Sequence, residues 1–311
     1  MEKQCIGVDL GRGFIKSYSN FGGKEYKVCF NSVYGTGREN VDYSNFDNPI
    51  SLEIDGEMYF FGELAIAESM NKSSNIRDSK ITNVAEKFLI AALSQIAVSK
   101  EVKIMFSVPN RDFSLETRNK IIEKYKGKTY KFKDNISGKR KEIYIADVNA
   151  MREADSALLF IERGKINKEP VALISVGSRT TEFAYFDKGL KFINAKSTSI
   201  QCGSRDVNAE VRKRLELEKI YKDEAEIDIS NNYDDKKKLA YEIIENKIYE
   251  EVEGLWGNTK IFENTYLCGG TSQNLNLDDS IFTKVNDPQL ATAKGLYLMG
   301  SRIFNTDKKR G

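Results

Sequence analysis

The sequence predicts an α/β protein built from two similar halves, and three observations support this fold class. Two turns rich in small residues, at 8–16 and 174–183, each follow a short apolar run and lead into another strand-like segment. Strand-like and helix-like segments alternate along the chain, as they do in α/β folds. At 311 residues the chain can hold two domains with separate cores. We therefore expect each half to make the same hairpin, and the two halves to close on one nucleotide.

The N-terminal half contains segments with clear strand or helix periodicity. Short apolar runs between glycine turns predict strands, and apolar residues that recur at helical spacing predict helices. Residues 31–80 have few long apolar runs and are expected to form a smaller inserted subdomain. The predicted elements are strands at 5–10, 14–19 and 25–30, a buried-face helix at 84–97, a strand at 102–108, an amphipathic helix at 115–125, and strands at 129–134 and 141–148.

The C-terminal half repeats the order of strand hairpin, crossover helix and insertion. Its first strands again flank a glycine turn, and its longest helices follow them. The predicted elements are a helix at 153–161, strands at 171–176, 180–186 and 190–200, helices at 205–218 and 235–253, a strand at 264–268 and a last helix at 288–304.

Composition excludes several classes of function. The net charge of +2 gives no reason to expect direct binding to nucleic acid or to a membrane. No window reaches the roughly 18 consecutive apolar residues that span a bilayer, and the first residues lack a signal-peptide core, so the cytoplasm is the expected compartment. The four cysteines form no CxxC pair and are expected to be reduced packing thiols. The chain has no histidine, which excludes Ser-His triads and histidine-ligated metals.

The first glycine turn contains candidate phosphate and metal ligands. Gly11 and Gly13 let the backbone approach a phosphate closely, so that N–H groups point at its oxygens. Asp9 at the strand end can hold a metal-bound water, and Lys16 on the next strand can place its ammonium near a phosphate. A purely structural hairpin is the alternative interpretation of this turn.

The second glycine turn strengthens the phosphate hypothesis. Gly177, Ser178, Thr180 and Thr181 supply small side chains and hydroxyl groups at the equivalent position. Two such turns in corresponding places favour a shared phosphate site over coincidence.

A third glycine turn, at 268–272, runs from a strand toward a predicted helix. Gly269 and Gly270 would lie against the sugar and α-phosphate of a nucleotide, where side chains would clash, with a helix N-terminus facing negative charge. The alternative is a simple helix entry with Thr271 or Ser272 as the N-cap.

Two further candidates lie on predicted helices. Glu153 can orient an attacking water, although a favourable first-turn carboxylate is the alternative. Arg212 and Lys213 can reach a nucleotide base, although a solvated helix face is the alternative.

Taken in order, these segments resemble the actin superfamily, and within it the ParM-like bacterial and archaeal actins. Five motifs in sequence carry the resemblance and span nearly the whole chain. They are a first phosphate motif at 9–16, a connecting segment at 148–157, a second phosphate motif at 175–182, an adenosine motif at 268–271, and a closing N-D-P-Q-L-A-x-x-x-G helix at 286–295.

The resemblance implies a two-domain actin-like (ribonuclease-H-like) fold. Each domain is expected to have a mixed five-stranded sheet with flanking helices and a small inserted subdomain. Domain I would comprise 1–155 and the C-terminal helix at about 288–304, with the insertion at about 31–80. Domain II would comprise 156–287, with an inserted helical subdomain at about 206–262.

The resemblance also implies a function. The protein would bind ATP or GTP with Mg²⁺, assemble into a polar homopolymer filament, and hydrolyse the nucleotide slowly as the filament disassembles. In plasmid-partition members the filament moves plasmid DNA through an adaptor bound at a centromere-like site, so the filament itself touches neither nucleic acid nor membrane. Catalysis would be in-line attack of water on the γ-phosphate.

Residue roles are carried over by position. Asp9 would hold the water shell of Mg²⁺, Lys16 would contact phosphate, and Glu153 would orient the hydrolytic water. Glycines 177, 269 and 270 would wrap the nucleotide, and Arg212 would lie in the base-binding helix.

The chain departs from the family pattern at two positions. Ser175 stands where the second phosphate motif normally begins with Asp, and Arg152 stands where a proline is common. Losing one carboxylate weakens the hold on Mg²⁺ and can slow hydrolysis. Two alternative functions therefore remain: a small-molecule, sugar-type kinase of the same superfamily, and a scaffold that binds nucleotide without hydrolysing it. The absence of histidine argues against the kinases that carry a His/Cys zinc motif.

Overall fold

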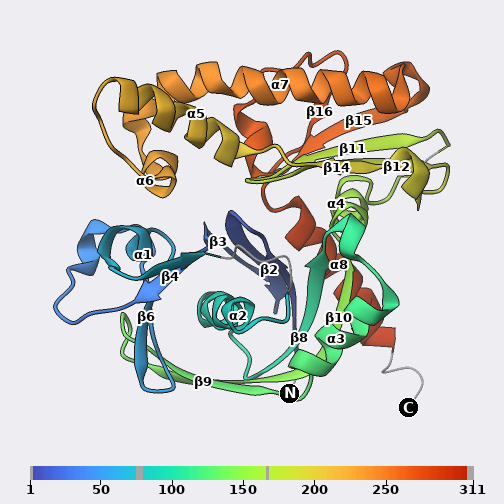
Figure 1. The fold of residues 1–311 in the computed structure, drawn as a ribbon. Helices are drawn as coiled ribbons and strands as arrows, with labels where there is room; N and C mark the ends of the chain where they lie inside the picture. The colour runs from blue at the N-terminus through green and yellow to red at the C-terminus, as the bar shows by residue number, and fades with distance from the viewer. Residues whose placement is uncertain (1–2, 75–79, 166–167, 307–311) are drawn as a thin grey trace. The chain divides into compact units, whose positions relative to one another are not determined.

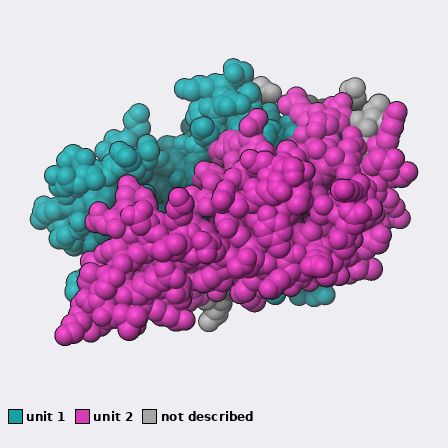
Figure 2. Space-filling view, turned by 90° about the horizontal axis from the view of Figure 1, so that it is seen from above, with its two compact units in different colours: residues 1–160, 292–311 teal, residues 161–291 magenta. Residues whose placement is uncertain are grey.

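The computed structural model describes residues 3–74, 80–165 and 168–306, so five positions of the predicted insertion, 75–79, lie outside the described residues. The chain divides into two compact units, which Figure 2 shows in different colours. Unit 1 comprises Met1–Phe160 and Thr292–Gly311, and unit 2 comprises Ile161–Ala291. Each unit has its own mixed sheet and its own hydrophobic core.

The described strands of unit 1 form one sheet of ten, in the order β3-β2-β1-β8-β10-β9-β5-β6-β4-β7. The first five are the mixed sheet that the sequence predicts, with β1 antiparallel to β2 and parallel to β8. The expected count of five is nevertheless wrong, because the long strand β10 pairs with β8 along one part and with β9 along another. The bounds are β1 (Gln4–Leu10), β2 (Phe14–Phe21), β3 (Lys24–Asn31), β4 (Val33–Thr36), β5 (Ile50–Ile54), β6 (Glu57–Phe61), β7 (Lys72–Ser74), β8 (Glu101–Val108), β9 (Thr129–Asp134) and β10 (Arg140–Arg152).

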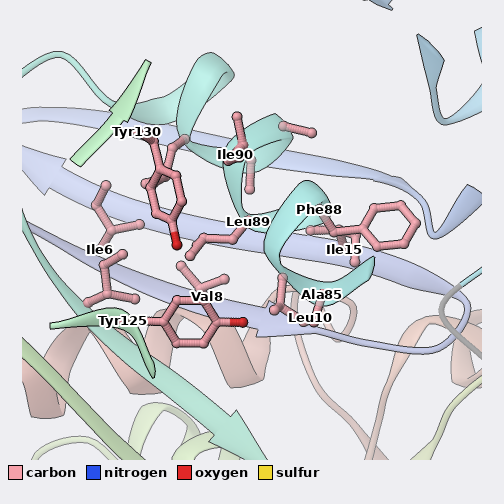
Figure 3. Close-up of a cluster of buried hydrophobic side chains, with 14 of the residues drawn as sticks. Ile6, Val8, Leu10, Ile15, Ala85, Phe88, Leu89, Ile90, Tyr125 and Tyr130 are labelled. Atoms are coloured by element: carbon pink, nitrogen blue, oxygen red, sulfur yellow. The ribbon is translucent and has the colours of Figure 1, made fainter. Parts of the chain in front are cut away.

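Helix α2 fills the core of unit 1 (Figure 3). Its Phe88 and Leu89 pack against Val8 and Ile15 of the sheet, and all four side chains are fully buried. Because side chains alternate along a strand, Gly7 and Asp9 lie on the other face of β1. The helices are α1 (Glu63–Glu68), α2 (Asn83–Ile96), α3 (Leu115–Tyr125), α4 (Glu153–Ile161) and α8 (Ala291–Thr306), with the 3₁₀ helices η1 (Tyr43–Asn45) and η2 (Asn110–Asp112).

Helix α8 packs against the face of β1 that carries Gly7. A Cβ atom at Gly7 would lie 2.2 Å from the carbonyl oxygen of Ala293, and one at Gly295 would lie 1.7 Å from that of Ser156. Only glycine fits at both contacts. The helix begins at Ala291 rather than at 288 as predicted, because Asp287 adopts a positive φ of 54° and the chain is still in a turn there.

Unit 2 has a sheet of six described strands in the order β13-β12-β11-β15-β16, with β14 paired to β12. The strand predicted at 190–200 is wrong, since two short strands flank a 3₁₀ helix there. Ser197 ends the first extended stretch, because its Oγ donates to Ile193 O and accepts from Tyr185 N. The bounds are β11 (Val171–Val176), β12 (Thr181–Asp187), β13 (Lys191–Phe192), η3 (Asn194–Lys196), β14 (Thr198–Ile200), β15 (Asn264–Cys268), η6 (Gly270–Asn274) and β16 (Thr283–Lys284).

Helix α7 lies over one face of this sheet, and α5 runs alongside α7 (Figure 1). The longest helix, α7, buries a stripe at every fourth residue, which is one face of an α-helix. The stripe is Ala240, Ile244, Ile248, Val252 and Trp256. The bounds are α5 (Ser204–Leu217), α6 (Glu224–Ile229), η4 (Asn231–Tyr233), α7 (Asp234–Trp256) and η5 (Thr259–Ile261). In the described part of the chain, no helix is both long and apolar enough to cross a membrane.

Candidate active site

A buried ion pair marks the carboxyl end of β1 in unit 1. Asp9 and Lys16 are register partners on β1 and β2, so both side chains lie on one face of the sheet. The Lys16 Nζ lies 2.9 Å from Asp9 Oδ2, and the side chains are 17% and 6% exposed. Ser107 on the neighbouring strand β8 donates to Asp9 Oδ1 at 2.7 Å. The structure thus brings together two residues that the sequence singled out.

The turn between these strands is fixed by its backbone. Ser32 donates from Oγ to Gly11 O at 2.7 Å and from N to Gly13 O at 2.8 Å. A Cβ atom at Gly11 would lie 2.5 Å from Phe14 O, so a side chain cannot be accommodated without a shift. The glycine turn is therefore a closed, rigid feature of unit 1.

The charges around Asp9 favour its ionised form. Burial raises the pKa of the Asp9 carboxyl, but the ammonium groups of Lys16 and Lys80 and the hydrogen bond from Ser107 lower it more. Burial lowers the pKa of Lys16, and the adjacent Asp9 carboxylate raises it above its ordinary value. Asp9 is therefore an anion and Lys16 a cation at neutral pH.

Glu153 is placed by the junction of two elements. It is the first residue of α4 and follows directly after β10, which runs parallel to β8 in the same sheet. Its Oε1 lies 3.8 Å from Lys80 Nζ, and its side chain is 27% exposed. Burial and the negative charge of Asp9 raise the pKa of Glu153, against the opposing effect of Lys80, Lys16 and Arg12. A carboxyl group with a raised pKa beside charged partners is typical of catalytic sites.

Sequence reasoning missed two residues of this cluster. Ser107 is a polar residue near the end of an otherwise apolar strand, and that contrast is a usable signal. Lys80 follows a segment with no strong periodicity, and its distance of 70 residues from its partner Leu10 hides the contact. Only the tertiary structure reveals Lys80.

The second hairpin, in unit 2, repeats the register of the first. Ser175 on β11 pairs with Glu182 on β12, so the partners are seven residues apart, as Asp9 and Lys16 are. Ser175 is half-buried, and the carboxylate of this ladder position belongs to Glu182 on the second strand. The departure at Ser175 therefore leaves a carboxylate close by, although on the other strand.

Three backbone segments meet at the second turn. Gly177 closes it, since its N–H donates to Thr180 O at 2.9 Å. The start of α5 approaches from one side, where Arg205 N donates to Ser178 O at 2.8 Å. The segment after β15 approaches from another, where Thr271 Oγ1 donates to Gly177 O at 3.0 Å. The structure thus gathers the small residues that two separate glycine turns supply.

Glycine is required where these segments touch. A Cβ atom at Gly203 would lie 2.4 Å from Gly177 O, and one at Gly269 would lie 2.3 Å from Val176 O. Gly269 also has a φ of +89°, which L side chains rarely adopt. Gly270 has more room, since a Cβ atom there would lie 3.4 Å from the Gln289 side chain. These close contacts explain why glycine occupies these positions. Because glycine has no side chain, the backbone at the turn is also left uncovered.

The helix predicted after β15 is present, but it is a 3₁₀ helix and its predicted N-cap is wrong. Residues Gly270–Asn274 form the 3₁₀ helix η6, whose N-cap is Gly269, without a side-chain cap. Thr271 and Ser272 therefore do not cap an α-helix, and the Ser272 Oγ donates instead to Gly269 O at 2.7 Å. The dipole of a longer helix is thus not available at this turn.

Arg212 has partners of its own on the helices of unit 2. It is on α5, where its guanidinium lies 3.2 Å from Glu224 and 3.6 Å from Glu216. Its side chain is 41% exposed. The ion pair with Glu224 connects α5 to α6.

The donor set of unit 1 fits a hydrated Mg²⁺. Among the described residues, no group of three or more His, Cys, Asp or Glu could hold a metal by itself. Magnesium, however, usually keeps several waters and is held by one or two carboxylates and the phosphates of its nucleotide. Each Asp9 oxygen accepts one hydrogen bond and can accept another, from a metal-bound water.

Comparisons with known proteins agree with this architecture. Residues 7–154 match the family model described as the actin-like proteins N-terminal domain. A comparison with curated proteins finds no match.

Solved structures resemble the chain over nearly its whole length. The archaeal actin homologue Ta0583 has a TM-score of 0.80 and 18% identity, and the match covers 96% of this chain and 99% of that one. Its complex with ADP has a TM-score of 0.77, 19% identity, and coverage of 96% and 99%. A 15-stranded ParM filament from Clostridium botulinum has a TM-score of 0.80, 18% identity, and coverage of 97% and 100%. The chain therefore has the fold of the ParM-like bacterial and archaeal actins, and its residues 7–154 match the actin-like N-terminal domain.

Proposed function

We propose that the protein is a nucleotide-dependent, filament-forming actin-like NTPase. The observation that carries the proposal is the charged cluster of unit 1, where the buried Asp9–Lys16 pair and Glu153 surround a rigid glycine turn. Anionic triphosphate requires cations close to it, and Lys16 of unit 1 is such a cation. Unit 2 has its own glycine-lined turn, at Gly177 and Gly269.

The chemistry would be attack of water on the γ-phosphate. Phosphoryl transfer needs positioning and charge neutralisation more than covalent catalysis. Lys16 would neutralise phosphate charge, Asp9 would accept a hydrogen bond from a Mg²⁺-bound water, and Glu153 would orient the attacking water. A bound Mg²⁺ would supply further neutralisation of charge on the phosphates. The raised pKa of Glu153 makes its carboxylate a stronger base than that of an ordinary glutamate.

Nucleotide contacts from unit 2 would come from small residues. Ser178 and Thr180 would donate hydroxyl hydrogen bonds to phosphate oxygens, while Gly270 would allow close approach of the sugar. Thr271, whose hydroxyl donates to Gly177 O, would hold the glycine turn in place. Arg212 would lie near the base. The complex of the archaeal actin homologue with ADP supports a nucleotide as the ligand, and the proposal covers ATP and GTP alike.

Assembly into a polar homopolymer is the second part of the proposal. Solved structures with the same fold include the multi-stranded ParM filament, which supports self-association of this chain. We infer that the filament moves plasmid DNA through a DNA-bound adaptor, as the resemblance to ParM-like actins implies. The filament would then contact the adaptor rather than DNA or a membrane.

One observation favours a second candidate, a scaffold that binds nucleotide without hydrolysing it. Ser175 replaces a carboxylate, and its register partner Glu182 belongs to the other strand. If Glu182 does not reach the Mg²⁺ water shell, the nucleotide would be held without efficient turnover.

Light scattering and phosphate release, followed together after addition of Mg²⁺ with ATP or GTP, test the proposal. We expect the triphosphate to trigger scattering, which then decays as phosphate is released. Asp9→Asn keeps the shape of the side chain but removes its charge, and should reduce nucleotide-dependent assembly at least tenfold, which corresponds to about 1.4 kcal/mol. The matched control is Asp147→Asn, because Asp147 pairs with Lys126 at a more exposed place in unit 1.

The outcomes separate the candidates. Scattering with slow phosphate release supports the filament NTPase, and binding with neither signal supports the scaffold. Normal assembly by Asp9→Asn would contradict the role of Asp9. Absence of triphosphate binding by the unaltered protein would overturn the proposal altogether.

A further inference from the structure

Lys80 has an unusual environment for a lysine. Its side chain is 8% exposed, less than the 17% of Lys16 in the neighbouring ion pair. It stands two residues before the Thr82 N-cap of α2, and thus at the edge of the charged cluster of unit 1. Lysine is rarely buried unless it is paired, because its ammonium loses hydration.

Three contacts hold Lys80 in place. Its Nζ donates to Leu10 O at 2.5 Å, and Leu10 is the last residue of β1 before the glycine turn. The same Nζ lies 3.8 Å from Glu153 Oε1. The backbone carbonyl of Lys80 accepts a hydrogen bond from the hydroxyl of Tyr125, whose ring is fully buried and stacked on Phe106.

Stability does not explain this lysine. A buried ion pair is often replaced by apolar residues with no loss of stability, because desolvation offsets the attraction between the charges. At 3.8 Å the pair with Glu153 is longer than a strong charged hydrogen bond, so its attraction compensates for desolvation less completely. The geometry instead connects two parts of the candidate site, the end of β1 and the start of α4.

We propose that Lys80 is a positioning residue, which fixes the Glu153 carboxylate relative to the glycine turn of β1. The ammonium group would bridge Leu10 O and Glu153, while Tyr125 anchors the backbone that carries it. All of these residues belong to unit 1, so the arrangement is complete within one compact unit. The inference rests on the proposed hydrolysis, because it gives Glu153 its task of orienting water.

The expected signature is a loss of turnover without a comparable loss of binding. A misplacement of about 1 Å in a reacting group can cost about 100-fold in rate. Lys80 would act through Glu153 and not through the nucleotide. Lys80→Met should therefore lower kcat about 10- to 100-fold, while nucleotide affinity changes less than about threefold.

The experiment measures phosphate release and the affinity for a fluorescent triphosphate on the full chain with Mg²⁺. Lys80→Arg keeps the positive charge and should restore part of the lost kcat. Lys141→Met is the matched control, because Lys141 also donates to a backbone carbonyl of unit 1, Ser94 O at 2.6 Å, but belongs to another part of the sheet. This control should hydrolyse nucleotide at the unaltered rate.

A milder variant provides the test if Lys80→Met does not fold. Tyr125→Phe keeps the stacked ring and removes only the hydrogen bond to Lys80 O. If circular dichroism shows that Lys80→Met is unfolded, a several-fold lower kcat in Tyr125→Phe supports the proposal, and an unchanged kcat overturns it.

The remaining outcomes are also decisive. A folded Lys80→Met that turns over at the unaltered rate overturns the role of Lys80 and leaves the proposed NTPase intact. A fall in affinity equal to the fall in kcat/KM also overturns it, since Lys80 would then act as a nucleotide ligand. Absence of hydrolysis by the unaltered protein overturns the proposed function, and the positioning role falls with it.

Discussion

The hairpins β1–β2 and β11–β12 have the same backbone design but different chemistry. In each unit the first strand is antiparallel to the second and parallel to a strand on its other side. In unit 1 the paired positions hold the ion pair of Asp9 and Lys16, whereas in unit 2 they hold Ser175 and Glu182. Close backbone contacts through Gly269 take the place of charge in unit 2.

This difference teaches that one hairpin geometry can serve two physical purposes. At the turn of unit 1, charged side chains lie close together. The stability of this turn should therefore respond most to pH and to changes of charge. At the turn of unit 2, backbone segments lie in close contact. The stability of this turn should therefore respond most to side-chain size. Three predictions follow in order of decreasing effect: two concern the hairpin of unit 2, and one concerns the response of unit 1 to acid.

The largest effect is expected from a single methyl group in unit 2. Gly269→Ala would place a Cβ atom 2.3 Å from Val176 O at a φ of +89°. The strain and the overpacking together should lower the free energy of unfolding by about 3 kcal/mol. Chemical denaturation followed by circular dichroism measures this change.

The control for this variant is another glycine of unit 2. Gly254 lies within α7, and a Cβ atom there meets no atom within 4 Å. Gly254→Ala should therefore stabilise the protein by about 0.5–1 kcal/mol, because alanine favours the helix. If the two variants behaved alike, steric closeness would not distinguish the turn of unit 2.

Acid should affect unit 1 through Glu86. Burial raises the pKa of this carboxyl, but hydrogen bonds from Lys124, Tyr130 and Lys128 outweigh burial and lower the pKa to about 2. The depressed pKa means that Glu86 contributes its full stability above its ordinary pKa of 4.5, and that this contribution is lost as the pH falls toward 2. After allowance for solvent screening, we expect a loss of about 2 kcal/mol over this range.

Unfolding curves between pH 7 and pH 2 measure this dependence, and Glu86→Gln identifies its source. The variant should be less stable at neutral pH and should show a flatter acid dependence than the unaltered protein. An equally steep dependence in Glu86→Gln would assign the acid sensitivity to other carboxyl groups.

The smallest effect concerns the register position that differs between the hairpins. Ser175→Asp would place a second carboxylate directly opposite Glu182 on the antiparallel ladder. Like charges in that arrangement destabilise by about 0.5–1 kcal/mol, and added salt should reduce the effect. Thermal unfolding at low and high salt, with Ser175→Asn as the uncharged control, measures it. Equal stability of the two variants would show that this position accepts a carboxylate as readily as its counterpart in unit 1.

Local sequence patterns predict much of the fold. The helix over Leu115–Tyr125 and the strands over Thr129–Asp134 and Val171–Val176 occur at the predicted bounds. Their signals are local, since side-chain periodicity and a capping residue such as Ser114 define them within a few residues. The two-domain α/β class is also confirmed, because the prediction rests on the same local patterns of strands and helices.

Errors arise where tertiary contacts override local preference. The segment 190–200 has the composition of a strand, but Ser197 accepts a hydrogen bond from Tyr185 N and interrupts it. The sheet of unit 1 exceeds five strands because β10 is long enough to pair with two neighbours. Neither effect has a signal within a short window of sequence.

The sequence likewise predicts one part of the candidate site and misses another. Asp9 and Lys16 lie on consecutive strands of one hairpin, so their meeting follows from a spacing of seven residues. Ser107 and Lys80 reach the cluster from 98 and 70 residues away, respectively, and only the folded chain brings them there. The roles assigned to all of the site residues, Asp9 and Lys16 included, stay predictions.

The close packing of α8 against Gly7 has a consequence for biosynthesis. Unit 2 is continuous in sequence, whereas unit 1 is completed only by residues after Thr292. A nascent chain leaving the ribosome would therefore present β1 with one face uncovered until α8 had emerged. Unit 2 can therefore complete its fold before unit 1, although N-terminal domains generally fold first during synthesis.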